Sequence, residues 1–102
     1  MSNPSVSIIV TNYNYGKYLP RCLRSCLSQR GANCEVIVVD DVSTDNSISI
    51  LRPFEDKIRV IKNEKNIGVA ASANEGLKMS RGQFVIRVDA DDFVSADMAY
   101  FM

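Results

Sequence analysis

The sequence predicts an α/β protein of three layers, α/β/α, built around a mainly parallel four-stranded sheet. Four short apolar runs rich in β-branched residues are spaced along the 102 residues, which is typical of strands covered on both faces. Segments with the apolar spacing of helices lie between these runs, and such alternation indicates parallel strands joined by right-handed crossovers. With 46% hydrophobic and 24% charged residues, the composition is that of one globular domain, residues 1–102.

The four predicted strands are bounded by polar turn residues. The first is VSIIVT at residues 6–11, and the second is CEVIVVD at residues 34–40. KIRVIKN at residues 57–63 and QFVIRVD at residues 83–89 form the third and fourth. No internal repeat, low-complexity tract or linker separates them, so we expect no domain boundary within the chain.

An apolar stripe predicts the first helix, because six residues recur at a spacing of three and four: Tyr18, Leu19, Cys22, Leu23, Cys26 and Leu27. Pro20 falls near the start of this helix, where a missing N–H is tolerated, and Gly31 marks its end. The helix places Cys22 and Cys26 on one face as buried small hydrophobic residues. A zinc site is the alternative, but the sequence has no histidine and no CxxC.

Three further helices complete the alternating pattern. Ser43 or Thr44 caps the second, which stops before Pro53. The third spans residues 69–79. Ser95 caps a fourth, and the chain ends inside it.

The charge balance excludes several classes of protein. Twelve Lys plus Arg residues balance 12 Asp plus Glu residues, so nothing favours nucleic acid or a membrane surface as a partner. We find neither a signal peptide nor an apolar run long enough to cross a membrane, and we expect a cytoplasmic protein. The P-loop and GxGxxG fingerprints are both absent, which argues against P-loop and dinucleotide-binding chemistry.

Polar side chains gather where the predicted strands end. Ligands bind at the carboxyl ends of parallel strands, so we expect one site formed by Thr11, Asn12, Tyr13 and Asn14, by Asp40, Asp41 and Asn63, and by Asp89, Asp91 and Asp92. Several carboxylates at one edge repel one another, and Mg²⁺ or Mn²⁺ would offset that repulsion and bind a diphosphate. Turns and helix caps also use these residue types, so either acidic segment alone has a purely structural explanation.

Three segments together resemble family 2 inverting glycosyltransferases. VSIIVTNYNYGKYLPRCLRSCLSQ is similar to their opening strand and helix, and CEVIVVDDVSTDNS to their second strand and acidic loop. NEKNIGVAASANEGLKMSRGQFVIRVDADD resembles the segment that ends in their metal-binding DxD motif. The resemblance covers residues 6–97 and implies the N-terminal half of a Rossmann-like glycosyltransferase A-type fold. It also implies sugar transfer from a nucleotide-diphosphate donor, such as a UDP-sugar, to an acceptor hydroxyl, with Mg²⁺ or Mn²⁺.

The resemblance implies roles for individual residues of a nucleotide pocket. Thr11 and Asn12 would line it, and Tyr13 would lie near a uracil-type base. Either Asp40 or Asp41 would hydrogen-bond that base.

Further implied contacts lie later in the chain. Asp91, the second carboxylate of DAD, would coordinate the metal, and Asp89 would lie near the ribose or the metal, with Asp92 as a neighbour. Three residues would support the pocket, namely Asn66 and Gly68 in the loop after the third strand and Asn74 on the third helix.

Three residues depart from the family pattern. Val42 stands where glycine is usual, and a β-branched residue disfavours positive φ, so the loop must change path or tolerate strain. Ala73 replaces an arginine that many members carry, which removes a cation near the nucleotide. Arg87 shares a strand face with Asp89, and it either pairs with that carboxylate or reaches the ligand.

The resemblance places the catalytic base and the acceptor-binding elements beyond Met102. We therefore expect a domain truncated after the DxD motif that binds the donor without turning it over, while the full-length protein binds a glycan or lipid-linked acceptor. Loss of the second half would expose apolar residues and favour a homo-oligomer, and these residues are Phe93, Val94, Tyr100, Phe101 and Met102.

Two other functions stay open from the sequence. A receiver-like signalling domain also binds Mg²⁺ with an acidic pair, as in VVDD, but here the pair ends the second predicted strand rather than the first. The later lysine and Ser/Thr switch residues of that class are not evident. The other alternative is a degenerate sugar-nucleotide fold acting as an interaction module, which Val42 and Ala73 favour.

Overall fold

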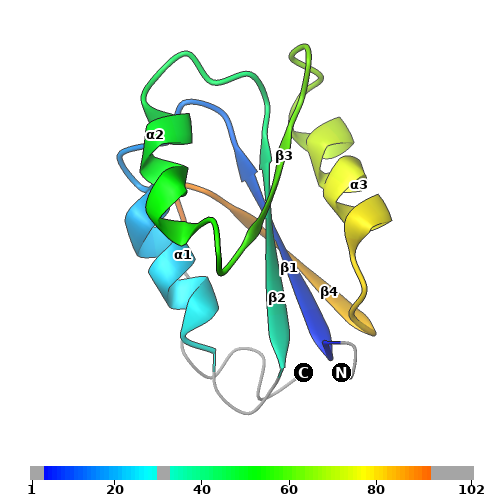
Figure 1. Ribbon diagram of the computed structural model, residues 1–102. Helices are drawn as coiled ribbons and strands as arrows, with labels where there is room; N and C mark the ends of the chain where they lie inside the picture. The colour runs from blue at the N-terminus through cyan, green and yellow to red at the C-terminus, as the bar shows by residue number, and fades with distance from the viewer. Residues whose placement is uncertain (1–3, 30–32, 93–102) are drawn as a thin grey trace.

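The computed structural model describes residues 4–29 and 33–92, which form a sheet with helices on both faces (Figure 1). Four strands pair in parallel in the order β3-β2-β1-β4, with the bounds β1 (Val6–Asn12), β2 (Cys34–Asp40), β3 (Arg59–Lys62) and β4 (Phe84–Asp89). The predicted three-layer α/β/α class with a four-stranded parallel sheet is confirmed.

Helices α1 (Leu19–Leu27) and α2 (Ser47–Leu51) lie on one side of the sheet, and α3 (Val69–Met79) lies on the other (Figure 1). A single 3₁₀ turn, η1 (Arg52–Phe54), continues α2. Pro20 lies in the first turn of α1, and α3 has the predicted bounds. No helix within the described ranges is both long and apolar enough to cross a membrane. The predicted stop at Gly31 and the predicted fourth helix after Ser95 lie outside the described residues.

The two central strands carry the core because side chains alternate between the two faces of the sheet. On one face, Ile8 and Val38 belong to a cluster with residues of α1 such as Leu23. On the other face, Ile9 packs with Ile37 and Val39, where α3 covers the sheet. Every residue of β1 is buried, including the polar Ser7, Thr11 and Asn12, as expected of a central strand covered on both faces.

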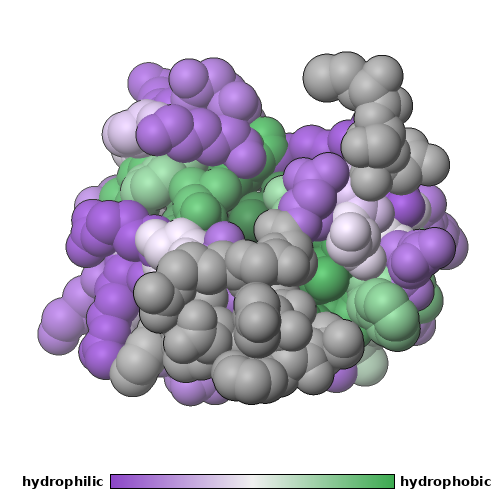
Figure 2. All heavy atoms as spheres, turned by 90° about the horizontal axis from the view of Figure 1, so that it is seen from below, coloured by the Kyte–Doolittle hydropathy of each residue, from purple (hydrophilic) through white to green (hydrophobic). Residues whose placement is uncertain are grey.

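The edge strands differ from the prediction. β3 is four residues long rather than seven, and β4 begins at Phe84 rather than at residue 83. The prediction that both faces of each strand are covered is wrong for β4, because Phe84 is 50% exposed and Val85 is 39% exposed. Consecutive residues of a strand point to opposite faces, and α3 packs on β1 and β2 rather than on β4. Viewed from the end where β1 and β2 begin, hydrophobic patches lie between hydrophilic side chains (Figure 2).

The predicted cap of the second helix is also wrong. The helix α2 begins only at Ser47, and its first turn receives no side-chain cap from the preceding residue, Asn46. Ser43 lies in the loop instead, where its N–H and Oγ donate to the Asp40 carboxylate at 3.0 and 2.7 Å. The buried carboxylate requires these donors, so the hydroxyl is not free to cap a helix.

Cys22 and Cys26 are fully buried, as predicted. A hydrogen bond with Cys26, together with burial, raises the pKa of Cys22, so its thiol stays protonated at neutral pH. Residues 4–29 and 33–92 contain no group of three or more His, Cys, Asp or Glu side chains that could hold a metal ion. The zinc alternative therefore has no support in the described part of the chain.

Candidate functional site

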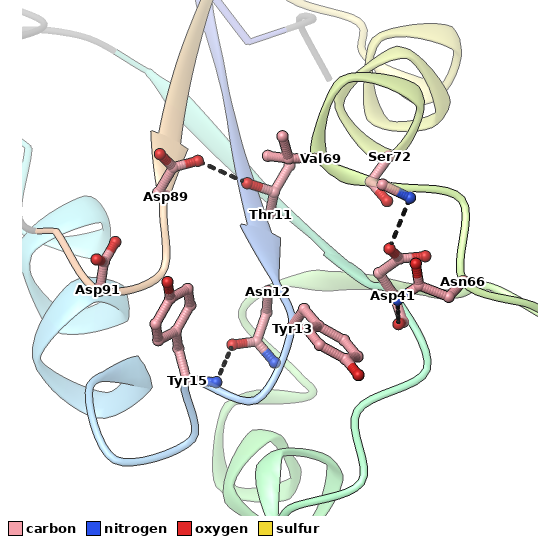
Figure 3. A pocket seen from close by; sticks show the side chains of 11 residues that line it. Thr11, Asn12, Tyr13, Tyr15, Asp41, Asn66, Val69, Ser72, Asp89 and Asp91 are labelled. Atoms are coloured by element: carbon pink, nitrogen blue, oxygen red, sulfur yellow. Dashed lines mark hydrogen bonds between the residues drawn. The ribbon is translucent and has the colours of Figure 1, made fainter.

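A pocket of about 390 Å³ opens at the carboxyl edge of the sheet (Figure 3). The loops after β1, β2 and β4 contribute to it, together with the start of α3. Its lining consists of Thr11, Asn12, Tyr13, Tyr15, Asp41, Asn66, Gly68, Val69, Ser72, Asp89 and Asp91. The parallel register explains the convergence, because Thr11 pairs with Asp89 across β1 and β4, and Asn12 pairs with Asp40 across β1 and β2.

Two carboxylates from the end of β4 form one side of the pocket. Asp89 and Asp91 are both exposed. Thr11 Oγ1 donates to Asp89 Oδ1 at 2.9 Å, and the Ala90 N–H donates to the Thr11 carbonyl at 3.0 Å. These bonds fix the strand end that carries Asp89, while the Asp91 carboxylate remains open to solvent (Figure 3).

Asp41 forms the opposite side and is held by three donors. Its carboxylate accepts hydrogen bonds at 2.8 to 3.0 Å from Ile67 N, Asn63 Nδ2 and Gly68 N. Burial alone would raise the pKa of Asp41, but these hydrogen bonds hold it below its usual value. A carboxylate offers about four acceptor positions, so ionised Asp41 keeps about one for a ligand.

Asp40 is buried and does not line the pocket. Its Oδ1 accepts from Asn12 Nδ2 at 2.8 Å and from Ser43 Oγ at 2.7 Å, so it ties the loops after β1 and β2 together. The resemblance leaves Asp40 and Asp41 as alternatives for base recognition, and only Asp41 lines the pocket.

Tyr13 and Tyr15 lie on either side of Asn12 in the close view of the pocket (Figure 3). The Tyr15 N–H donates to Asn12 Oδ1 at 3.3 Å. The Tyr15 ring also meets the edge of Tyr18, with ring centroids 6.2 Å apart. Both pocket tyrosines remain substantially exposed, so their rings offer flat apolar faces to a ligand.

The start of α3 closes the pocket beside Asp41. Gly68 has φ of 88°, a conformation that favours glycine, and it turns the chain into the helix at Val69. Asn66 Nδ2 donates to the Asp41 carbonyl at 3.1 Å, and Ser72 Oγ accepts from Asn63 Nδ2 at 3.1 Å. Asn66 and Gly68 therefore lie in the pocket wall.

Three lining residues are absent from the sequence prediction: Tyr15, Val69 and Ser72. Residues three apart on a helix share a face, so the predicted helix start at residue 69 contained the signal for Val69 and Ser72. Tyr15 had a weaker signal, since it lies two residues after Tyr13 in the same loop.

Other predicted residues lie outside the pocket. Asn74 is exposed on α3 and is not part of the lining, and neither is Asp92. Arg87 is exposed, and within the described ranges it neither pairs with Asp89 nor lines the pocket. Asp89 accepts from Thr11 instead.

Val42 adopts the left-handed conformation that glycine would favour. Its φ is 62°, so this loop tolerates strain at a β-branched residue. The neighbours explain how, because Asp41 is fixed by the loop before α3 and Ser43 is fixed by Asp40.

Comparison with known families decides the identity of the chain. The model described as glycosyl transferase family 2 matches residues 7–100. The chain belongs to this family. Glycosyltransferase GlyG of Streptococcus pneumoniae serotype 4 is 40% identical to this family 2 chain over 96 residues, covering 91% of the chain and 32% of GlyG.

Solved structures of glycosyltransferases share the fold of this family 2 chain. S. aureus TarS 1-349 in complex with UDP-GlcNAc superposes with a TM-score of 0.87 at 34% identity, over 95% of the chain and 29% of TarS 1-349. The mannosyltransferase PcManGT of Pyrobaculum calidifontis, in complex with GDP-Man and Mn²⁺, gives 0.81 at 27% identity, over 91% of the chain and 29% of PcManGT. The predicted A-type glycosyltransferase fold is confirmed. The chain spans only 29% to 32% of these three proteins.

Proposed function

We propose that this chain is the donor-binding part of a glycosyltransferase that transfers a sugar from a nucleotide-diphosphate donor to an acceptor hydroxyl. The observation that carries the proposal is that Thr11, Asp41, Asp89 and Asp91 line one shared pocket at the carboxyl edge of the sheet. The complexes of TarS with UDP-GlcNAc and of PcManGT with GDP-Man support a nucleotide sugar as the ligand. We infer a UDP-sugar-like donor.

Asp89 and Asp91 have the chemistry to hold Mg²⁺ or Mn²⁺. These ions prefer oxygen ligands and are commonly bound by one or two carboxylates together with substrate phosphates. The described residues supply two exposed carboxylates here and no larger cluster, so phosphate and water would complete the coordination. When bound, the ion would stabilise the negative charge that develops on the departing nucleoside diphosphate. Thr11 would orient Asp89 through its 2.9 Å hydrogen bond.

Asp41 is the proposed partner of the nucleotide base. It lies across the pocket from Asp89 and Asp91 (Figure 3). Its lowered pKa keeps it ionised at neutral pH, and its remaining acceptor position suits an N–H of a uracil-type base. Tyr13 would pack near the same base, and Asn12 would complete the pocket wall.

Transfer itself is proposed for the whole protein rather than for these 102 residues. We infer that a catalytic base and a site for a glycan or lipid-linked acceptor lie beyond Met102, in a cytoplasmic enzyme. The chain alone should bind the donor and transfer no sugar, and turnover by it in a radiolabelled-sugar assay would contradict this.

Calorimetric titration of UDP into the chain, with and without Mn²⁺, tests the proposed site. We expect Mn²⁺ to strengthen UDP binding and Asp91→Asn to weaken it at least about 10-fold in the presence of the ion, because loss of a residue that only supports a metal ligand already costs about 10- to 100-fold. The matched control is Asp56→Asn, which removes an exposed carboxylate outside the pocket and should leave affinity unchanged.

Two outcomes would contradict the proposal. A folded chain that binds no UDP or GDP at millimolar concentration would favour the interaction-module alternative. Equal weakening by Asp91→Asn and Asp56→Asn would show that the overall negative charge of the protein, rather than a local carboxylate site, attracts the metal ion.

A further inference from the structure

The loops after β1 and β2 are joined by reciprocal hydrogen bonds near the pocket. Asn14 has φ of 60°, and its Oδ1 accepts from the N–H of Thr44 at 2.7 Å and of Asp45 at 3.1 Å. The Asn14 N–H donates to Ser43 Oγ at 3.0 Å. One side chain of the first loop thus satisfies two successive amides of the second.

Asp45 makes the return contact. Its Oδ2 accepts from the Gly16 N–H at 2.9 Å, and its Oδ1 accepts from the N–H and Oγ of Ser47 at 2.9 and 2.5 Å. The approach is close, because a Cβ on Gly16 would lie 3.0 Å from Asp45 Oδ2 and from Ile50 Cδ1. We call the contacts made by Asn14 and Asp45 the loop latch.

The loop latch lies on both sides of Tyr15 and directly after Tyr13. Tyr13 precedes Asn14, and Tyr15 lies between Asn14 and Gly16, so a latch contact lies on both sides of Tyr15. Both tyrosines are substantially exposed, and the Tyr15 ring packs against Tyr18. The latch contacts therefore hold the backbone that carries Tyr15 and the residue that follows Tyr13.

We propose that Asn14 and Asp45 are positioning residues that set the Tyr13 and Tyr15 rings for a nucleotide sugar. Neither residue lines the pocket, so each acts through the tyrosines. The inference rests on the proposed function for its ligand, and it adds a device that fixes two walls of the site before the ligand arrives. Preorganised walls raise affinity because the ligand need not order them.

Two substitutions at one position isolate the loop latch. Asn14→Gly accepts the positive φ without steric cost but removes Oδ1, whereas Asn14→Asp keeps an oxygen acceptor for the same two amides. We expect Asn14→Gly to weaken UDP binding about 5- to 10-fold, the loss equivalent to one or two net hydrogen bonds, and Asn14→Asp to restore most of the affinity. Equal affinity of folded Asn14→Gly and the wild-type chain would overturn the proposal.

A double-substitution cycle separates positioning from general stability. In a Tyr13→Ala/Tyr15→Ala background, Asn14→Gly should cost less than about 2-fold in affinity, because the rings that it positions are gone. The same 5- to 10-fold loss in that background would assign Asn14 a merely structural role. If Asn14→Gly fails to fold, Asp45→Asn replaces it in the cycle, with the same two outcomes.

Fluorine NMR tests the loop latch independently of the ligand. The sequence has four tyrosines, so 3-fluorotyrosine labelling gives four resonances to follow. Asn14→Gly should shift or broaden those of Tyr13 and Tyr15, assigned by Tyr→Phe variants, and Asn14→Asp should not. Unchanged Tyr13 and Tyr15 resonances in Asn14→Gly would overturn the latch even if UDP binds to the wild-type chain. If Asn14→Gly shows the expected shifts but the wild-type chain binds no UDP, only the proposed function is contradicted.

Discussion

At the residue scale, Val42 shows the cost of departing from a glycine position. A non-glycine residue in the left-handed region costs roughly 1–2 kcal/mol, and a β-branched one lies at the upper end. The hydrogen bonds of Asp41 and Ser43 on either side hold the backbone there nonetheless. The strain thus lies directly beside the carboxylate that lines the pocket.

Replacing Val42 with glycine should therefore stabilise the protein. Glycine removes the steric cost but loses more entropy on folding, which leaves a net gain of about 1 kcal/mol in the free energy of unfolding. Urea denaturation would measure it. Val85→Gly is the matched control, since both valines are 39% exposed, but Val85 lies in a strand and should lose stability. A loss of stability in Val42→Gly similar to that in Val85→Gly would show that Val42 is unstrained.

At the element scale, Glu35 links the starts of the strands. Its carboxylate accepts from Ser7 Oγ of β1 at 2.5 Å, from Arg59 of β3 at 3.2 Å, and from the Arg81 N–H just before β4 at 2.6 Å. The Glu35 side chain is only 8% exposed. This network lies at the opposite edge from the pocket, so its role is to hold the sheet together.

Glu35→Gln should destabilise the fold by about 1–3 kcal/mol, because the buried Ser7 hydroxyl and two arginines lose a charged acceptor. Glu75→Gln is the comparison, since Glu75 pairs with Lys78 at 3.3 Å on the exposed surface of α3 and should contribute under about 0.5 kcal/mol. Both are read from urea midpoints. Similar midpoints for the two variants would refute a structural role for the Glu35 network.

Gly76 sets the distance between α3 and the sheet. A Cβ at this position would lie 2.5 Å from Ile9 Cγ2 and 3.2 Å from Val39 Cγ2. Alanine favours helix by about 1 kcal/mol, yet overpacking costs typically 1–3 kcal/mol, so Gly76→Ala should be net destabilising by about 1 kcal/mol. Thermal melting would measure the stability of Gly76→Ala and of the comparison variant Ala70→Gly. Ala70 is an exposed position of α3, where glycine is the unfavourable residue. A stabilised Gly76→Ala would contradict close packing of α3.

At the scale of the whole molecule, three carboxylates should make stability depend on pH in acid. Burial opposes ionisation of Glu35, Asp41 and Asp45, but hydrogen bonds leave the pKa of each below its ordinary value of 4.5 or 3.8. A lowered folded-state pKa stabilises the ionised fold above the unfolded pKa, and that contribution is lost as the pH falls through the folded-state pKa.

Urea midpoints should therefore be level between about pH 5 and 7 and fall steadily below about pH 4.5. The absence of histidine supports the level region, since no histidine titrates there. Asp41→Asn should fall less steeply in acid than the wild-type chain. A midpoint that is unchanged down to pH 3, or that falls between pH 7 and 5, would contradict the role of these carboxylates.

Much of the fold followed from local patterns, and less of the site did. Buried runs such as residues 34–40 predicted β2 with its observed bounds, and helical spacing gave α3. The strand β4 was misjudged because an apolar run does not reveal which neighbour covers it. Ser43 was assigned to a cap because sequence spacing cannot show that a buried carboxylate, Asp40, binds its hydroxyl.

The site was predictable where it depends on strand ends and not where it depends on side-chain direction. The parallel register brought Thr11 and Asp89 together, as expected. Asn74 does not line the pocket, because the packing of a helix determines which of its residues face a site. Here α3 packs with Gly76 against Ile9. That Asp41 rather than Asp40 lines the pocket depends on the loop before α3, whose path no local pattern specifies.

One ligand should contact both sides of the pocket, and amide NMR of the labelled chain tests this most directly. On addition of UDP with Mg²⁺, we expect concerted shifts at Gly68 beside Asp41 and at Asp91 across the pocket, with one shared dissociation constant. Replacing Mg²⁺ with Mn²⁺ should broaden the amides near Asp89 and Asp91 more strongly than that of Gly68. Shifts confined to one side, or broadening centred elsewhere on the protein, would contradict a single nucleotide-sugar site.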